Sequence, residues 1–166
     1  MKQTRQSAGA PGRVGQQEDA QAALRWHVIR SFGAVPLAVE GAPMHRLGRL
    51  AGSRVLVAAC LPDETVDVGV LLALLALRDG VPGPHEGLVV IGWRFAAAIH
   101  DDLQGLNTPG VFLVRVLGAV PVATGAPVRF EPLRRLVLGP AARRMVLGEL
   151  RERLTLSLSD YRAPPG

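Results

Sequence analysis

Three short runs of this chain are apolar at almost every position, and the residues between them follow helical spacing. The runs are Val55–Cys60, Gly87–Trp93 and Val111–Leu117. A run that is apolar on both faces is typical of a central strand covered on both sides. The segments between the runs, Val66–Leu77 and Phe95–Leu106, are long enough for helical crossovers between parallel strands. The pattern predicts an α/β fold with a Rossmann-like βαβαβ three-layer core. The residues expected to be buried in its adjacent parallel strands are Val57, Val90 and Val114.

The chain before this core predicts one helix and several short strands. From Asp19 onward the apolar residues recur at helical spacing, with Asp19 as the N-cap and Gly33 in the left-handed position that ends the helix. Three extended segments follow, at residues 35–39, 46–50 and 54–60. Pro36 places the first of them at a sheet edge, because proline has no N–H for the ladder. The other two form a hairpin around a three-residue loop.

The same pattern divides the chain into one domain with a tail. Residues 1–19 lack hydrophobic periodicity and are expected to form a flexible tail. Residues 20–118 form the α/β core, and residues 119–166 a basic antiparallel extension of the same domain, beginning with a connecting loop. Residues 153–161 alternate strictly between apolar and polar positions, which indicates a half-buried antiparallel strand. The expected fold therefore carries short antiparallel β extensions at both ends.

Composition supports a globular domain and makes charge the main functional signal. Of 166 residues, 48% are hydrophobic and 20% charged, which excludes a fully disordered or collagen-like chain. The 19 basic residues exceed the 14 acidic ones, giving a net charge of +5. Residues 119–166 hold eight arginines and four acids. On one face these arginines would suit a phosphate backbone. Alternatively they are scattered, solvated side chains, and an arginine excess also follows from GC-rich coding.

Cysteine usage and hydropathy predict a cytoplasmic location. Cys60 is the only cysteine, so neither an intramolecular disulfide nor a thiolate metal cluster can form. We expect it to be a small buried hydrophobe. Residues 1–15 lack the apolar segment of a secretory signal. The longest apolar run, Val66–Leu77, contains Asp67 and is too short to span a bilayer. No membrane association is expected.

The first apolar strand is not followed by a phosphate-binding glycine loop. Neither G-x-G-x-x-G nor G-x-x-x-x-G-K-[ST] occurs after Val55–Cys60, so we expect no NAD, FAD or S-adenosylmethionine to bind. Instead Asp63, Glu64 and Asp67 stand at the carboxyl end of this strand, where open α/β sheets place their sites. They would suit a magnesium ion or a general base, but a helix N-terminus needs the same residue types. We favour capping, and expect no catalytic residue and no cofactor.

Two other groups of residues are candidates for chemistry. His100 stands beside Asp101 and Asp102, yet neighbouring helix positions point to different faces, and no histidine pair has the spacing of a zinc site. A solvated helix face is the favoured interpretation, and no metal is expected. Trp93 and Phe95 flank Arg94, so the rings are possible base-stacking groups around a phosphate-binding arginine, or core aromatics beside an exposed arginine. The candidate nucleic-acid-binding residues are Arg94, Arg134, Arg135, Arg143 and Arg144.

The order of several short motifs resembles one protein family. The motifs are Leu24–His27, Gly33–Leu37, Val39–Gly41, Val55–Ala59, Glu64–Asp67 and Val89–Phe95. In this order they resemble the region carboxyl-terminal to the catalytic core of large bacterial site-specific DNA (adenine) methyltransferases. The segment Leu156–Tyr161, followed by Pro164, is similar to the closing strand of that region. The resemblance covers residues 22–162.

The departures from this family bear directly on function. Its enzymes carry an (Asp/Asn/Ser)-Pro-Pro-(Tyr/Phe) motif for the target amino group and a Phe-x-Gly-x-Gly motif for S-adenosylmethionine. Neither occurs here, since Asp160–Pro165 has the wrong order and spacing. The resemblance implies a detached accessory module or a truncated remnant that binds DNA or a methyltransferase partner and is not itself a methyltransferase. Two alternatives stay open: a small α/β enzyme with a site at Asp63, Glu64 and Arg94, at the C-terminal ends of the parallel strands, or a protein–protein interaction domain.

Overall fold

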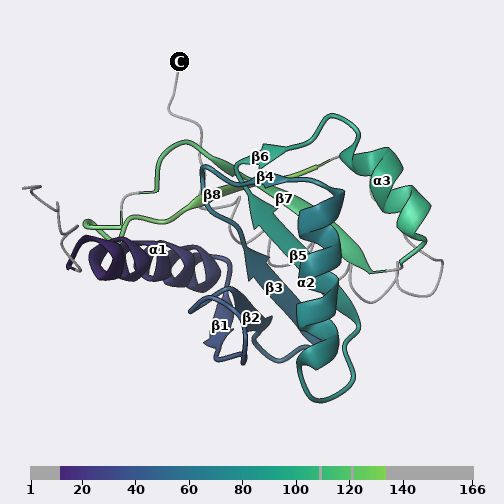
Figure 1. The fold of residues 1–166 in the computed structure, drawn as a ribbon, viewed down its shortest axis with the longest axis horizontal. Helices are drawn as coiled ribbons and strands as arrows, with labels where there is room; N and C mark the ends of the chain where they lie inside the picture. Colours follow the sequence, from purple (N-terminus) through teal and green to yellow (C-terminus); the bar gives the residue numbers. More distant parts are fainter. Residues whose placement is uncertain (1–11, 109, 121, 134–166) are drawn as a thin grey trace, which may run out of the picture.

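The protein is a mixed α/β domain built on one six-stranded sheet (Figure 1). The computed structural model describes residues 12–108, 110–120 and 122–133. The sheet has the strand order β1-β2-β3-β5-β7-β8. The strands are β1 (Ala34–Leu37), β2 (Leu47–Leu50), β3 (Val55–Ala59), β5 (Gly87–Gly92), β7 (Val111–Leu117) and β8 (Arg129–Pro132).

The three central strands are parallel, as their two-sided apolar pattern predicts. β3 pairs with β5 and β5 pairs with β7, both parallel. The crossovers contain helix α2 (Val68–Gly80) and helix α3 (Ile99–Leu106). Val57, Val90 and Val114 lie in these three strands and are fully buried, which confirms the expectation for them. The outer strands β1, β2 and β8 pair antiparallel with their neighbours.

Alternate residues of the central strands enter two separate hydrophobic cores. On β3, Val55 and Val57 pack with Val28 and Ile29 of helix α1 (Gly12–Ser31). Leu56 points the other way and packs with residues of α2 and α3. Helices thus cover both faces of the sheet, α1 on one and α2 with α3 on the other (Figure 1). The carboxyl end of β3 lies where α1 and α2 both approach the sheet, and this positions the candidate site.

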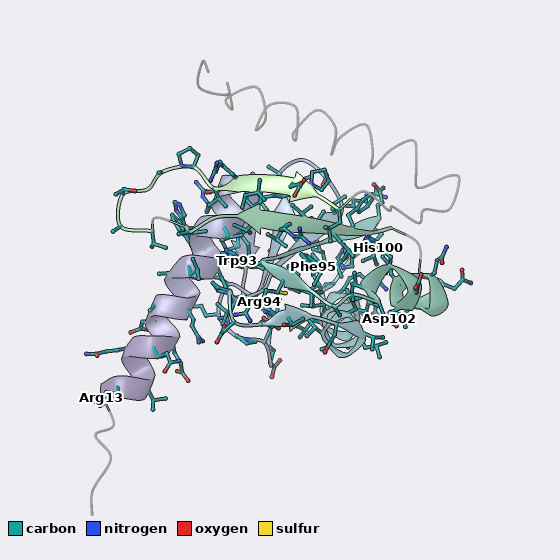
Figure 2. All side chains as sticks on the ribbon, turned by 90° about the horizontal axis from the view of Figure 1, so that it is seen from above. Arg13, Trp93, Arg94, Phe95, His100 and Asp102 are labelled. Carbon is teal, nitrogen blue, oxygen red and sulfur yellow. The ribbon has the colours of Figure 1, made fainter. Side chains whose placement is uncertain are left out.

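Helix α1 begins earlier than the sequence indicated. The expected N-cap, Asp19, lies inside the helix, which starts at Gly12, so residues 12–19 are not a flexible tail. Residues 12–20 are exposed and bury no apolar face, and hydrophobic periodicity therefore gave no signal for them. In Figure 2, Arg13 stands at the end of α1 that extends away from the sheet. The helix ends as expected, because Gly33 has a positive φ of 86°.

The predicted starts of α2 and α3 are also wrong, for a shared reason. Thr65–Val66 forms strand β4, and Arg94–Phe95 forms strand β6. The two strands pair in parallel as a second, two-stranded sheet. β-branched and aromatic residues favour such extended backbone. Each helix consequently begins after its short strand, at Val68 and at Ile99.

The segment after β7 is only partly described. Residues 119–130 were expected to be a connecting loop, and β8 begins within them at Arg129. It pairs antiparallel with β7, with Phe130 opposite Val116. The strand predicted at residues 153–161 and the arginines at 134, 135, 143 and 144 lie outside the described residues.

Candidate functional site

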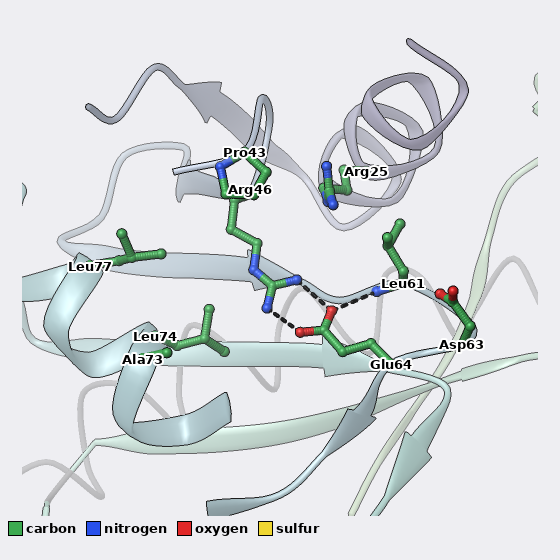
Figure 3. Close-up of a pocket in the computed structure, with 9 residues that line it drawn as sticks. All are labelled: Arg25, Pro43, Arg46, Leu61, Asp63, Glu64, Ala73, Leu74 and Leu77. Carbon is green, nitrogen blue, oxygen red and sulfur yellow. Dashed lines mark hydrogen bonds and ion pairs between the residues drawn. The ribbon is translucent and has the colours of Figure 1, made fainter. Parts of the chain in front are cut away.

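An open pocket of about 420 Å³ lies at the carboxyl end of β3 (Figure 3). Its walls come from α1, the turn before β2, the turn after β3 and the middle of α2. The lining residues are Arg25, Pro43, Arg46, Leu61, Asp63, Glu64, Ala73, Leu74 and Leu77. The pocket thus combines two arginines and two acids with an apolar wall, at the sheet edge where α/β proteins commonly place their sites.

Arg46 and Glu64 form a two-pronged ion pair on one side of this pocket. Arg46 Nη2 lies 2.5 Å from Glu64 Oε1, and Nη1 donates to Oε2 at 2.6 Å. Nη1 also donates to the carbonyl oxygen of Ala59 at 3.0 Å, while the backbone N–H of Leu61 donates to Glu64 Oε2 at 3.1 Å. The pair therefore ties the turn after β3 to the start of β2 (Figure 3).

This contact keeps both partners charged. Burial alone would raise the pKa of Glu64, but hydrogen bonds and charge from Arg46 and the N–H of Leu61 outweigh burial and hold it below its ordinary value. Burial alone would likewise lower the pKa of Arg46, and Glu64 and Cys60 outweigh that effect, so this pKa is raised. Fork-to-carboxylate geometry is the arrangement for which arginine is suited.

Arg25 is the second cation of the pocket, and its situation is different. Its side chain projects from α1, and the residue is only 6% exposed. It makes one hydrogen bond, a long one of 3.4 Å from Nη1 to the carbonyl oxygen of Met44. Nε is buried without a hydrogen-bond partner among the described residues. Burial and the charge of Arg46 lower the pKa of Arg25, and the opposite charges of Glu64 and Asp63 offset this only in part.

The three acids predicted near this strand end have separate roles. Asp67 is the N-cap of α2, and its carboxylate accepts from the N–H of Val70 at 2.9 Å, as the capping interpretation expects. Glu64 is held by Arg46. Asp63 is exposed on the pocket lip. Arg94 donates from Nε to the carbonyl oxygen of Pro62 at 3.0 Å, so it contacts the same turn but does not line the pocket.

Trp93 and Phe95, which are labelled in Figure 2, pack against different hydrophobic cores. Trp93 packs against the core that includes α1, and its Nε1 donates to the carbonyl oxygen of Gly118 at 3.2 Å. Phe95 packs against the core beneath α2 and α3. The rings therefore present no common surface around the exposed Arg94, and the geometry favours the core interpretation over base stacking.

The remaining reactive groups are isolated from one another. Cys60 is buried, and burial raises its pKa to about 12, so its thiol stays protonated at neutral pH. His100 is half-buried in the first turn of α3, beside the exposed Asp101. Within residues 12–108, 110–120 and 122–133, no three His, Cys, Asp or Glu side chains are grouped to hold a metal ion.

Sequence reasoning missed the two arginines of the pocket. The helical spacing predicted for this segment picked out Ala22, Ala23, Trp26, Ile29 and Arg30. Of these Ala22 and Ile29 are buried, and the other buried residues of α1 are Arg25 and Val28. The signal was present, since Arg25 falls three residues from both Ala22 and Val28, and an arginine in a buried stripe is unusual. Arg46 carried no comparable signal, because its partner Glu64 is distant in sequence.

No model of a known protein family, no curated protein and no solved structure matches this chain. The resemblance to the methyltransferase region therefore stays a prediction. In the described part of the chain, every helix is too short or too polar to cross a membrane.

Proposed function

We propose that this chain is a non-catalytic accessory module of DNA modification and that it binds duplex DNA. The observation that carries the proposal is a separation of charge. Residues 12–133 hold ten arginines and eleven acids and are nearly neutral. The remaining 44 of the 166 residues hold nine basic and three acidic residues, a net charge of +6. Cationic segments attached to a neutral domain suit the phosphate backbone, which supplies most sequence-independent affinity.

The structural roles of the acidic residues at the end of β3 support the proposal that the module is non-catalytic. Glu64 accepts hydrogen bonds from Arg46 and Leu61, and Asp67 caps α2. Cys60 is a buried, protonated thiol. The groups nearest to this strand end therefore act in holding the fold. The association with DNA modification rests on the family resemblance.

A matched pair of double variants tests DNA as the partner. We expect Arg134→Ser/Arg135→Ser to weaken binding to duplex DNA and to flatten the slope of log affinity against log salt by roughly 0.9 for each phosphate that the protein no longer neutralises. Arg13→Ser/Arg49→Ser removes the same charge from two exposed positions of the neutral part and should bind like the wild type. Equal reductions in affinity for both variants, measured by fluorescence anisotropy, would refute a specific role for the C-terminal arginines.

A methyltransferase partner is the competing outcome. The two partners are distinguished by mixing the chain with an adenine methyltransferase in the absence and presence of DNA. The proposal expects co-elution only when DNA is present. A stable complex without DNA would overturn it in favour of a protein–protein interaction domain.

A further inference from the structure

The pocket at the end of β3 holds a buried cation that makes no ion pair among the described residues, and the charges of Glu64 and Asp63 on the same pocket offset its burial only in part. Arg25 is 94% buried, and none of the ion pairs among the described residues includes it. Of the five N–H donors of a guanidinium, one makes a long hydrogen bond, to the carbonyl oxygen of Met44. An uncompensated charge away from water is costly unless it is paired. Arg25 lines the open pocket and keeps N–H donors that have no hydrogen-bond partner among the described residues.

Arg46 does not reduce the free-energy cost of burying the charge of Arg25. Its charge is already matched by the carboxylate of Glu64 through two hydrogen bonds. It also lies close enough to Arg25 for the two like charges to interact unfavourably. An anion bound beside Arg25 would complete its hydrogen bonds and also screen it from Arg46.

The rest of the pocket wall restricts what that anion can be. Pro43, Leu61, Leu74 and Leu77 present apolar surface, and Leu61 and Leu74 are themselves buried. The volume of about 420 Å³ lies in the usual range for small-molecule pockets. A ligand with an anionic head and a short apolar body would satisfy both parts of the wall.

The acids at the pocket favour a singly charged head. Asp63 and Glu64 both line it, and a dianionic phosphate would be repelled by them more strongly than a monoanion. A carboxylate is also planar and matches the donor fork of a guanidinium. The negative charge of Asp63 and Glu64 therefore favours a carboxylate over a dianionic phosphate.

We propose that this pocket binds a small amphiphilic carboxylate, with its head on Arg25 and its apolar body against Leu74 and Leu77 of α2. The pocket is lined by residues of the described domain, whereas DNA binding is assigned to residues outside it. Different variants and different ligands therefore test the two proposals, and one can fail without the other.

Three probes of one chain length test the chemistry: octanoate, 1-octanol and n-octyl phosphate, titrated into the full chain by calorimetry at neutral pH. Octanoate should bind at least about tenfold more tightly than either of the others, because charge-assisted hydrogen bonds are stronger than neutral ones and excess charge is repelled. Equal affinity for octanol would show nonspecific apolar binding and overturn the proposal. Tighter binding of octyl phosphate, or no binding of octanoate at millimolar concentration, would also overturn it.

A matched pair of variants tests whether the carboxylate of the ligand binds to Arg25. Arg25→Met removes the charge at similar length and should abolish the preference for octanoate over octanol, whereas Arg30→Met, at an exposed position of the same helix, should keep it. Arg25→Met should unfold at no lower a temperature than the wild type, because an apolar side chain replaces an unpaired cation. In the wild type, octanoate should shift the Nε–H resonance of Arg25 in a nitrogen–proton correlation spectrum. An unchanged Nε–H resonance at saturating octanoate, or unchanged octanoate selectivity in Arg25→Met, would place the ligand elsewhere.

Discussion

At the residue scale, the contact between Arg46 and Glu64 holds together segments that are far apart in sequence. It links the start of β2 to the turn after β3 through a two-pronged pair, with further bonds to Ala59 and Leu61. The side chains are 10% and 26% exposed, respectively. Breaking such a pair leaves a largely buried charge without its partner, and this costs more than the intact pair contributes.

We therefore expect Arg46→Met to lower the free energy of unfolding by about 2–3 kcal/mol, below the range for fully buried pairs because Glu64 is partly solvated. Arg49→Met is the control, since Arg49 is exposed on the same strand, and should change stability by less than about 0.5 kcal/mol. Urea denaturation measures both. Equal effects of the two substitutions would contradict the role given to Arg46.

The ion pair between Arg46 and Glu64 also makes the stability of the fold depend on pH. The folded-state pKa of Glu64 lies below its ordinary value, so its stabilising contribution is complete above the unfolded pKa and is lost as the pH falls through the folded one. Wild-type stability should thus fall more steeply than that of Glu64→Gln below about pH 4.3, the ordinary pKa of glutamate. Urea denaturation at several acidic pH values measures this. Glu86→Gln should follow the wild type, because Glu86 faces the exposed Arg54 at the longer distance of 3.5 Å. Parallel declines in the wild type and Glu64→Gln would refute this account.

Local rules predicted some of these residues and not others. Asp67 was readable as a cap, because the cap and the helix it starts are adjacent in sequence. The environments of Arg25 and Arg46 depend on Met44 and Glu64, which reach them only through tertiary folding. Sequence patterns report local geometry, and the pocket is assembled from four segments.

At the scale of elements, the close approach of α1 to the sheet depends on a glycine. A Cβ on Gly48 of β2 would lie 2.6 Å from Ile29 Cγ2 and 2.9 Å from the carbonyl oxygen of Val35. The second neighbour is backbone of the adjacent strand and has little freedom to shift. Gly48 therefore allows α1 and β1 to pack where they do.

Gly48→Ala should lower the free energy of unfolding by about 1–3 kcal/mol, as overpacking of a core does. Gly105→Ala is the matched control, because a Cβ there meets nothing within 4 Å and alanine favours a helix more than glycine does. It should raise stability by up to about 1 kcal/mol. Thermal unfolding measures the stability of both variants. If Gly48→Ala is as stable as the wild type, the packing of α1 and β1 around Gly48 is looser than described.

The elements that the sequence predicted best are those buried on both faces. β3, β5 and β7 were found with their parallel order, because apolar residues fill their whole length. The first part of α1 was missed, since it buries nothing and its polar residues leave no periodicity. The β4–β6 pair was missed because two residues per strand are too few to show alternation.

At the scale of the whole molecule, the described domain is close to neutral, and the residues that give the chain its net positive charge lie outside it. Residues 12–133 carry a net charge of −1, within a chain of net +5. The predicted α/β class is confirmed by a six-stranded mixed sheet with helices on both faces, and the Rossmann-like detail of the core stays a prediction. The proposed affinity for DNA is assigned to the cationic residues outside this domain.

Salt-dependent binding of the full chain to duplex DNA tests this account most directly. At about 50 mM salt, where phosphate contacts are strongest, the wild type should bind a labelled duplex, and log affinity should fall linearly as log salt rises. The slope should correspond to several phosphate contacts, at roughly 0.9 per contact. Fluorescence anisotropy over a salt series measures both quantities. Absence of binding at about 50 mM salt, or an affinity that does not change with salt, would contradict the assignment of this protein as a DNA-binding module.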